Sequence, residues 1–154
     1  EIGLPATVLE RGLDHTLREA TRQMLSDLET TATGVCARCH HPVEWQLQAV
    51  DDAAGSYHVI ARCTACAMAY GSPIVGWAVA DWDVRAELQV SGLDLLEIPP
   101  WSLPTLSVSA PTLVEGDLSA DPDQAVFRLT LDLDERLLTV DIDGTATVRS
   151  IEEG

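Results

Sequence analysis

The chain has 154 residues, with 25 Asp and Glu against nine basic residues, all of them Arg, and its formal net charge is −16 at pH 7. A surface this negative repels phosphate backbones and anionic lipids, which excludes a basic-patch nucleic-acid binder and a protein of the membrane surface. The longest apolar stretch, residues 67–80, is interrupted by Gly and Pro and is shorter than the roughly 20 residues of a membrane helix. Residues 1–31 contain no signal-peptide pattern, so a folded cytoplasmic protein is expected.

The carboxylates are spread along the whole chain, without the unbroken run of five or six that would form an acidic tail. Asp outnumbers Glu by 14 to 11, and Lys is absent. Molar salt reduces the screening distance to roughly 3 Å and so suppresses the repulsion among such carboxylates. The composition therefore favours a halophilic origin, and a GC-rich genome that replaces Lys by Arg is the alternative.

Two helices are predicted before the first cysteine. Pro5 suits a first helical turn and Gly12 a C-terminal stop, which predicts a short helix over residues 5–11. In the second helix, Thr16 and Glu19 form a capping box near the start. Its apolar residues recur at three- and four-residue spacing: Leu13, Leu17, Ala20, Met24 and Leu28. This stripe is expected to pack on the rest of the chain, or else to form a dimer seam.

A β-hairpin is predicted over residues 43–62. Apolar and polar residues alternate over residues 43–49 and again over residues 57–62, which is the period of half-buried strands. The polar, Gly-containing residues 51–56 between them provide the turn. A further apolar segment, residues 74–80, follows Pro73.

Four cysteines flank this hairpin, as Cys36-Ala-Arg-Cys39 and Cys63-Thr-Ala-Cys66. Two residues between cysteines let each pair form a tight knuckle, and the hairpin brings both knuckles onto one tetrahedral ion. All four ligand positions are then filled by thiolates, and no open position remains for water or substrate. One structural Zn²⁺ in a zinc ribbon is therefore predicted, with mononuclear iron, two disulfides or a thioredoxin-like redox site as alternatives.

Neither histidine of the first knuckle is expected to bind the metal, since the thiolate set is complete without His40 and His41. His40 and Ala67 each follow the second cysteine of a knuckle, where Gly usually relieves a positive φ. Ala has no polar side chain to stabilise that conformation, so the second knuckle is expected to bend differently.

Residues 81–92 give two conflicting signals. Their apolar positions alternate as in a strand, but their composition favours a helix, and Gly92 stands where a helix would stop. The prolines that follow, Pro99, Pro100 and Pro104, predict an extended connection and then a polar stretch up to Asp123.

The last third predicts a three-strand antiparallel meander over residues 125–132, 137–142 and 145–151. Residues 133–136 provide the first turn. Asp143-Gly144 predicts a type I′ turn with two positive-φ positions for the second.

No catalytic constellation is found. His15, His58 and the carboxylates show no spacing that pairs an acid with a base, and neither a phosphate-binding Gly-rich loop nor a serine elbow is present. We therefore expect a protein that is not an enzyme. The four tryptophans are expected to pack in the core, with a ligand pocket as the alternative: Trp45, Trp77, Trp82 and Trp101.

Three segments beside the cysteines carry a family resemblance: Val-Glu-Trp at 43–45, Ser-Gly-Leu-Asp-Leu-Leu-Glu-Ile-Pro-Pro-Trp at 91–101, and Asp121-Pro122. Together with the ribbon, they make residues 34–150 similar to the C-terminal domain of haloarchaeal winged-helix, ArsR-like transcription regulators. The resemblance implies a zinc-stapled regulatory or dimerisation domain, and a helix over residues 81–91. Residues 1–33 are too short and too acidic to be the winged helix that holds DNA in that family, so this chain is not expected to bind DNA.

The sequence thus predicts an α+β chain with a helical segment (1–33), a four-cysteine zinc ribbon (34–80) and an α+β part (81–154) in which one or two helices pack on the meander. The expected function is that of a non-enzymatic regulatory or dimerisation domain of a transcription regulator, with a protein partner or a second copy as its contact. The alternative is an adaptor that docks a basic protein through its acidic C-terminal face.

Overall fold

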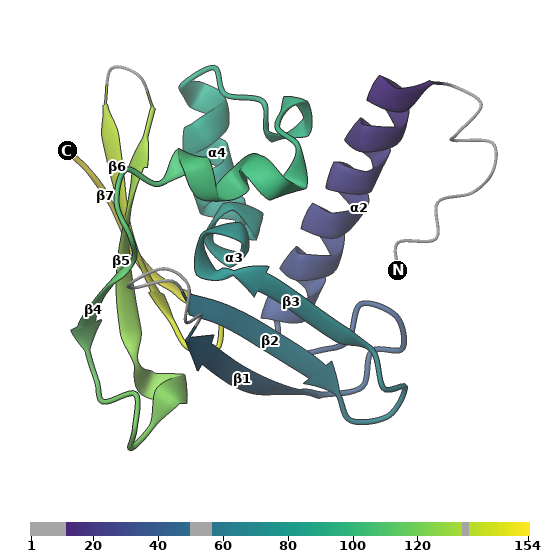
Figure 1. The fold of residues 1–154 in the computed structure, drawn as a ribbon, viewed down its shortest axis with the longest axis vertical. Coiled ribbons are helices and arrows are strands. Elements are labelled where there is room, and N and C mark those ends of the chain that lie inside the picture. Colours follow the sequence, from purple (N-terminus) through teal and green to yellow (C-terminus); the bar gives the residue numbers. More distant parts are fainter. Residues whose placement is uncertain (1–11, 50–56, 134–135) are drawn as a thin grey trace.

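A computed structural model describes residues 12–49, 57–133 and 136–154. These residues form the predicted α+β fold, with a three-stranded and a four-stranded antiparallel sheet and helices beside and between them (Figure 1). The helix predicted over residues 5–11 and the turn predicted over residues 51–56 lie outside the described residues.

Helix α2 (Leu13–Ala32) is the long N-terminal helix that the sequence predicts. Its N-cap is Gly12, with a φ of 97°, and no side chain caps it. The predicted capping box is wrong, because Thr16 lies inside the first turn and its hydroxyl donates to the Gly12 carbonyl oxygen at 2.9 Å. A hydroxyl that is bonded back to the preceding turn is not available as a cap.

The buried face of α2 also differs in part from the predicted stripe. Leu13 at the start of the helix is 72% exposed, whereas Leu25 and Leu28 in the second half are 3% exposed. Three threonines, Thr16, Thr21 and Thr31, complete the buried face, whereas Leu17, Ala20 and Met24 of the predicted stripe are half-buried. The fully buried leucines of the helix therefore lie in its C-terminal half.

The predicted hairpin is confirmed. Strand β1 (Val43–Ala49) pairs antiparallel with β2 (Tyr57–Cys63), and Val43 lies opposite Cys63. A third strand, β3 (Ala69–Pro73), pairs with the other side of β2 and was not predicted. Its Gly and Pro are typical of a turn, and here they are tolerated because β3 is an edge strand.

Helix α3 (Ile74–Ala80) follows directly and is buried on all sides. Trp77 is fully buried, and its indole N–H donates to the Val59 carbonyl oxygen at 2.9 Å. A Cβ on Gly76 would lie 2.0 Å from the Ser72 Oγ and 3.2 Å from its Cβ, so a larger residue would force the Ser72 side chain to move. The absence of a polar face explains why the sequence predicts an apolar segment without indicating its type.

The ambiguous segment is a helix, α4 (Trp82–Val90). The Asp81 carboxylate caps it by accepting from the backbone N–H groups of its second and third residues, and Gly92 follows its end with a φ of 82°. Val84 and Leu88, four residues apart, are its buried positions. This is the helix that the family resemblance implies.

The expected extended connection after α4 is wrong. The structure has two 3₁₀ helices there, η1 (Leu95–Glu97) and η2 (Pro100–Leu106). Proline at the first position of η2 already has the φ of a helix, and the turn buries Leu103 and Leu106, which an extended chain could not do together.

The predicted polar stretch contains the exposed strand β4 (Thr112–Glu115) and a short 3₁₀ helix, η3 (Pro122–Gln124). The predicted meander then follows as β5 (Val126–Asp132), β6 (Leu137–Asp143) and β7 (Val148–Glu153). The sheet order is β4-β5-β6-β7, so β4 extends the meander by one edge strand.

The type I′ turn predicted at Asp143-Gly144 is wrong. Among the residues of this loop the positive φ belongs to Ala146, and β7 begins at Val148 rather than at 145. The buried Asp143 shapes the loop, since its Oδ1 accepts from the backbone N–H groups of the residues two and four further on. Gly144 is required by space, because a Cβ there would lie 2.0 Å from the Pro122 carbonyl oxygen.

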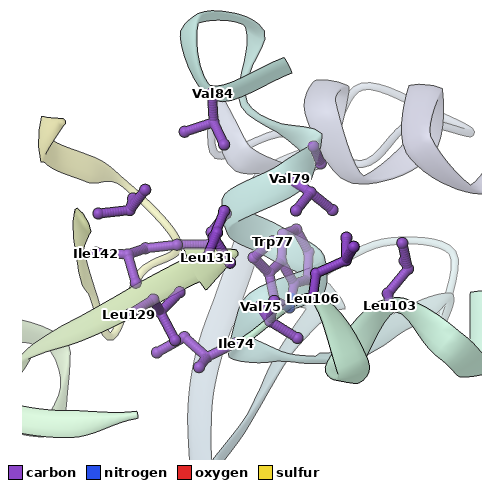
Figure 2. Close-up of a cluster of buried hydrophobic side chains, with 14 of the residues drawn as sticks. Ile74, Val75, Trp77, Val79, Val84, Leu103, Leu106, Leu129, Leu131 and Ile142 are labelled. Atoms are coloured by element: carbon purple, nitrogen blue, oxygen red, sulfur yellow. The ribbon is translucent and has the colours of Figure 1, made fainter. Parts of the chain in front are cut away.

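The two sheets share one hydrophobic core around α3. Figure 2 shows side chains of α3 among those of η2 and of the four-stranded sheet: Ile74, Val75, Trp77, Val79, Leu103, Leu106, Leu129, Leu131 and Ile142. The core therefore contains residues from both the ribbon and the C-terminal part, and α2 adds Leu25 and Leu28. The division at residues 33 and 80 stays a prediction.

The tryptophans divide into two pairs. Trp45 is half-buried and packs edge-on against the buried Trp77, with ring centroids 5.3 Å apart. Trp82 and Trp101 are both 69% exposed, so the expectation that all four pack in the core is wrong for these two. No helix among the described residues is both long and apolar enough to cross a membrane.

Trp77→Phe is expected to lower the free energy of unfolding by about 1–3 kcal/mol, because it leaves a buried carbonyl without its donor. Chemical denaturation measures this difference. Trp101→Phe is the matched control and should change stability by less than about 0.5 kcal/mol, since its ring is exposed. Equal losses in both variants would contradict the central position of α3.

Candidate metal centre

Two short segments hold the four cysteines: the loop between α2 and β1 carries Cys36 and Cys39, and the end of β2 with the loop to β3 carries Cys63 and Cys66. In the first loop the backbone N–H of Cys36 donates to the His41 carbonyl oxygen at 2.8 Å. In the second loop the backbone N–H of Cys63 donates to the Met68 carbonyl oxygen, also at 2.8 Å. In each knuckle the first cysteine thus donates to the carbonyl oxygen five residues further on, and the two knuckles share this backbone hydrogen bond.

The two knuckles also share their bend. His40 has a φ of 60° and Ala67 a φ of 58°, so both residues after the second cysteines lie in the left-handed region. The expectation that the second knuckle bends differently is wrong. The closing hydrogen bond requires this conformation whichever residue stands there, although it costs Ala roughly 1–2 kcal/mol.

Backbone N–H groups point at the first sulfur of each knuckle. The N–H of Arg38 lies 3.4 Å from the Cys36 Sγ, and that of Ala65 lies 3.3 Å from the Cys63 Sγ. Hydrogen bonds of this kind favour the thiolate over the thiol, and the thiolate is the form that binds a metal.

The structure brings the four predicted cysteines together. Their Sγ atoms all lie within 4.8 Å of one another, with 3.7 Å from Cys36 to Cys66 and 3.4 Å from Cys39 to Cys63. Four sulfurs at about 2.3 Å from one tetrahedral ion would be about 3.8 Å apart, which is close to these separations. They are much longer than the bond of a disulfide, about 2.05 Å. The residues therefore fit one metal ion bound by four thiolates.

The thiol pKa values reflect the crowding of the sulfurs. Burial raises the pKa of Cys36, but hydrogen bonds from the Cys39 backbone N–H and the Tyr70 hydroxyl outweigh it and lower this pKa to about 6. Two backbone N–H groups of its own knuckle lower the pKa of Cys63. The His41 backbone N–H lowers the pKa of Cys39. Burial and the three neighbouring cysteine side chains have the larger, opposite effect and raise the pKa of Cys39 to about 12.

Tyr70 on β3 is a residue of the site that the sequence does not indicate. Its hydroxyl lies 3.6 Å from the Cys36 Sγ, and burial together with that sulfur raises the pKa of the phenol. No spacing rule connects Tyr70 to the cysteines, and the strand that positions it was itself not predicted.

The neighbouring histidines stand apart from the sulfurs. His40 and His41 are both exposed, and the cluster of ligand atoms among the described residues consists of the four cysteines without a histidine. Four sulfurs are enough to fill a tetrahedral coordination shell without a histidine.

The fold and the site define an α+β protein with two paired cysteine knuckles. Residues 3–148 match the family described as a domain of unknown function, DUF7351, and the chain belongs to this family. Neither the curated proteins nor the solved structures contain a match to the chain.

Cys63→Ser is expected to abolish metal binding and to unfold the knuckles and the β1–β2 hairpin, because structural metal ions contribute on the order of 10 kcal/mol to such small modules. Elemental analysis of the purified chain and hydrogen exchange over residues 43–49 and 57–63 measure the two effects. Thr64→Ser changes the same knuckle without touching a sulfur and should keep both. Wild-type exchange protection in a metal-free Cys63→Ser chain would contradict the role of the site.

Proposed function

We propose that this protein is a non-enzymatic regulatory or dimerisation domain of a transcription regulator, stapled by one structural Zn²⁺ on Cys36, Cys39, Cys63 and Cys66. The observation that carries the proposal is the cluster of four thiols within 4.8 Å of one another, which includes no His, Asp or Glu of the described residues. A bound Zn²⁺ would supply a cross-link between the two knuckles. With four thiolates around it, no coordination position is left for a substrate, which supports a structural rather than a catalytic role.

Zn²⁺ is the ion that this donor set suits best. A tetrahedral site of four sulfurs is typical of zinc and of iron–sulfur centres. The cysteines occupy two matched knuckles around a hairpin, the arrangement of a structural zinc ribbon. Iron is the competing metal, and metal analysis distinguishes the two.

The regulator part of the proposal rests on the resemblance to haloarchaeal ArsR-like regulators. The helix implied by that resemblance is present as α4, and residues 91–101 follow it through η1 to the start of η2, which carries the buried Leu103 and Leu106. These features support the assignment beyond the cysteines. In such a regulator, DNA contact would belong to a separate winged helix.

The arginines of the described chain support a role away from DNA. Six of them form ion pairs with carboxylates: Arg18, Arg22, Arg85, Arg128, Arg136 and Arg149. Arginines that already neutralise carboxylates contribute little to the neutralisation of phosphates, on which DNA affinity depends.

One observation favours the second candidate, a protein adaptor. Both edges of the four-stranded sheet carry exposed carboxylates, Glu115 on β4 and Glu152 and Glu153 on β7. A basic protein partner could form ion pairs with the carboxylates of either edge. A winged helix encoded upstream would support the regulator, and an initiator Met directly before Glu1 would support the adaptor.

The isolated 154-residue chain is expected not to bind duplex DNA, because its net charge is −16 and six of its nine arginines form ion pairs with carboxylates in the described part of the chain. Fluorescence anisotropy with labelled duplex, at low salt and at molar KCl, tests this, and a winged-helix protein serves as the positive control. Saturable binding that weakens with salt would place a DNA surface in this chain and contradict the proposal.

The melting temperature is expected to rise with KCl concentration. At low ionic strength the 25 carboxylates repel one another, and screening relieves this repulsion. Thermal unfolding at increasing KCl measures the effect, with sucrose as an uncharged control for solute exclusion. A melting temperature that stays flat or falls with KCl would point to codon usage rather than to halophily.

A further inference from the structure

We propose that a cleft between α2, α4 and residues 92–96 binds a small organic monocarboxylate with an apolar body. The cleft has a volume of about 560 Å³, which lies within the range of small-molecule sites in proteins. Figure 1 shows the course of the chain beside it: the chain turns from the end of α4 towards α2 before it returns to the four-stranded sheet.

The floor of the cleft is apolar. Leu25 of α2 and Leu95 of η1 contribute to the lining and are 3% and 6% exposed, and the half-buried Leu93 and Leu96 lie beside them. Such a surface gains free energy from a ligand that brings apolar area, at roughly 25 cal/mol for each Å² removed from water. A small inorganic anion would leave this surface unused.

Two guanidinium groups from different helices line the same cleft, Arg22 on α2 and Arg85 on α4. The Arg85 side chain is 23% exposed and held from two sides, by Glu29 at 2.6 Å and by the Trp82 ring, whose centroid lies 5.4 Å from its Cζ. A guanidinium has five N–H donors, so a single ion pair leaves donors for a ligand carboxylate. Arg85 is therefore the anchor that the structure prepares best.

The local charge disfavours a ligand with several negative groups. Of the two lining arginines, Arg22 is paired with Glu19 and Arg85 with Glu29, and Asp94 adds a further carboxylate to the lining. The whole chain has a net charge of −16, so a polyanion is repelled, while a single carboxylate can accept from those guanidinium N–H donors that one ion pair does not use.

Trp82 gains a role in this assignment. Its ring is 69% exposed although it lines the cleft, and it lies against the Arg85 guanidinium rather than in the core. Beside a guanidinium, an indole face offers a flat apolar wall against which the body of a ligand can pack.

The proposal is independent of zinc and of the regulator assignment, because no cysteine lines the cleft. The probes for its test are naphthalene-2-carboxylate and its neutral amide, titrated calorimetrically into the full 154-residue chain. The carboxylate is expected to bind with one site per chain, and the amide about tenfold more weakly, since it lacks the charge that the guanidinium recognises.

Two variants and a control assign the binding to the cleft. Arg85→Gln should reduce the affinity for the carboxylate about tenfold and leave that for the amide unchanged, which also shows that the cleft stays folded. Ala86→Trp replaces a small, exposed lining residue and should block both probes. Arg128 lies on β5 of the four-stranded sheet, does not line the cleft and is paired with Asp141. Arg128→Gln should therefore change neither affinity.

Absence of saturable binding, or equal affinities for carboxylate and amide, would overturn the proposal. Equal losses in Arg85→Gln and Arg128→Gln would overturn it as well, because they would show an effect of net charge alone. Should Arg85→Gln fail to fold, Arg22→Gln replaces it, since Arg22 is more exposed. The metal content of every variant should equal that of the wild type, so that a failure here is distinct from a failure of the zinc proposal.

Discussion

The convergence of four cysteine sulfurs is the constraint on which the ribbon depends. Four Sγ atoms within 4.8 Å of one another repel as thiolates, and a divalent cation at their centre turns that repulsion into attraction. The local backbone is arranged for this purpose: both knuckles close with the same hydrogen bond, hold one residue at positive φ and direct N–H groups at a sulfur. The β1–β2 register then places Val43 opposite Cys63 and fixes one knuckle beside the other.

Strand β2 transmits this constraint to the rest of the molecule. It carries Cys63 at one end, and four residues earlier the Val59 carbonyl oxygen accepts the indole N–H of Trp77. Trp77 belongs to α3, which is buried on all sides and contributes to the core shared with the four-stranded sheet (Figure 2). The cysteine site and the C-terminal sheet are therefore connected through one helix, and loss of a bound ion should also destabilise the four-stranded sheet.

The sequence predicts those parts of the fold that depend on local pattern. The hairpin, the meander and the convergence of the cysteines follow from alternation and from spacing, which need no knowledge of distant contacts. Other parts depend on tertiary contacts: β3 is stabilised by its pairing with β2, and η2 exists because it buries Leu103 and Leu106. The loop after β6 follows Asp143 and the close approach of Gly144 to Pro122 rather than a two-residue turn rule. For the same reason the sequence indicates the four sulfurs but neither Tyr70 beside them nor the cleft at Arg85.

The central claim is that one zinc ion is held by four sulfur ligands. X-ray absorption at the zinc edge, on the purified chain, measures the identity, number and distance of those ligands directly. The account predicts four sulfur atoms at about 2.3 Å and no nitrogen or oxygen neighbour in the first shell. A shell that includes nitrogen or oxygen, fewer than four sulfurs, or a chain that carries iron in place of zinc would contradict it.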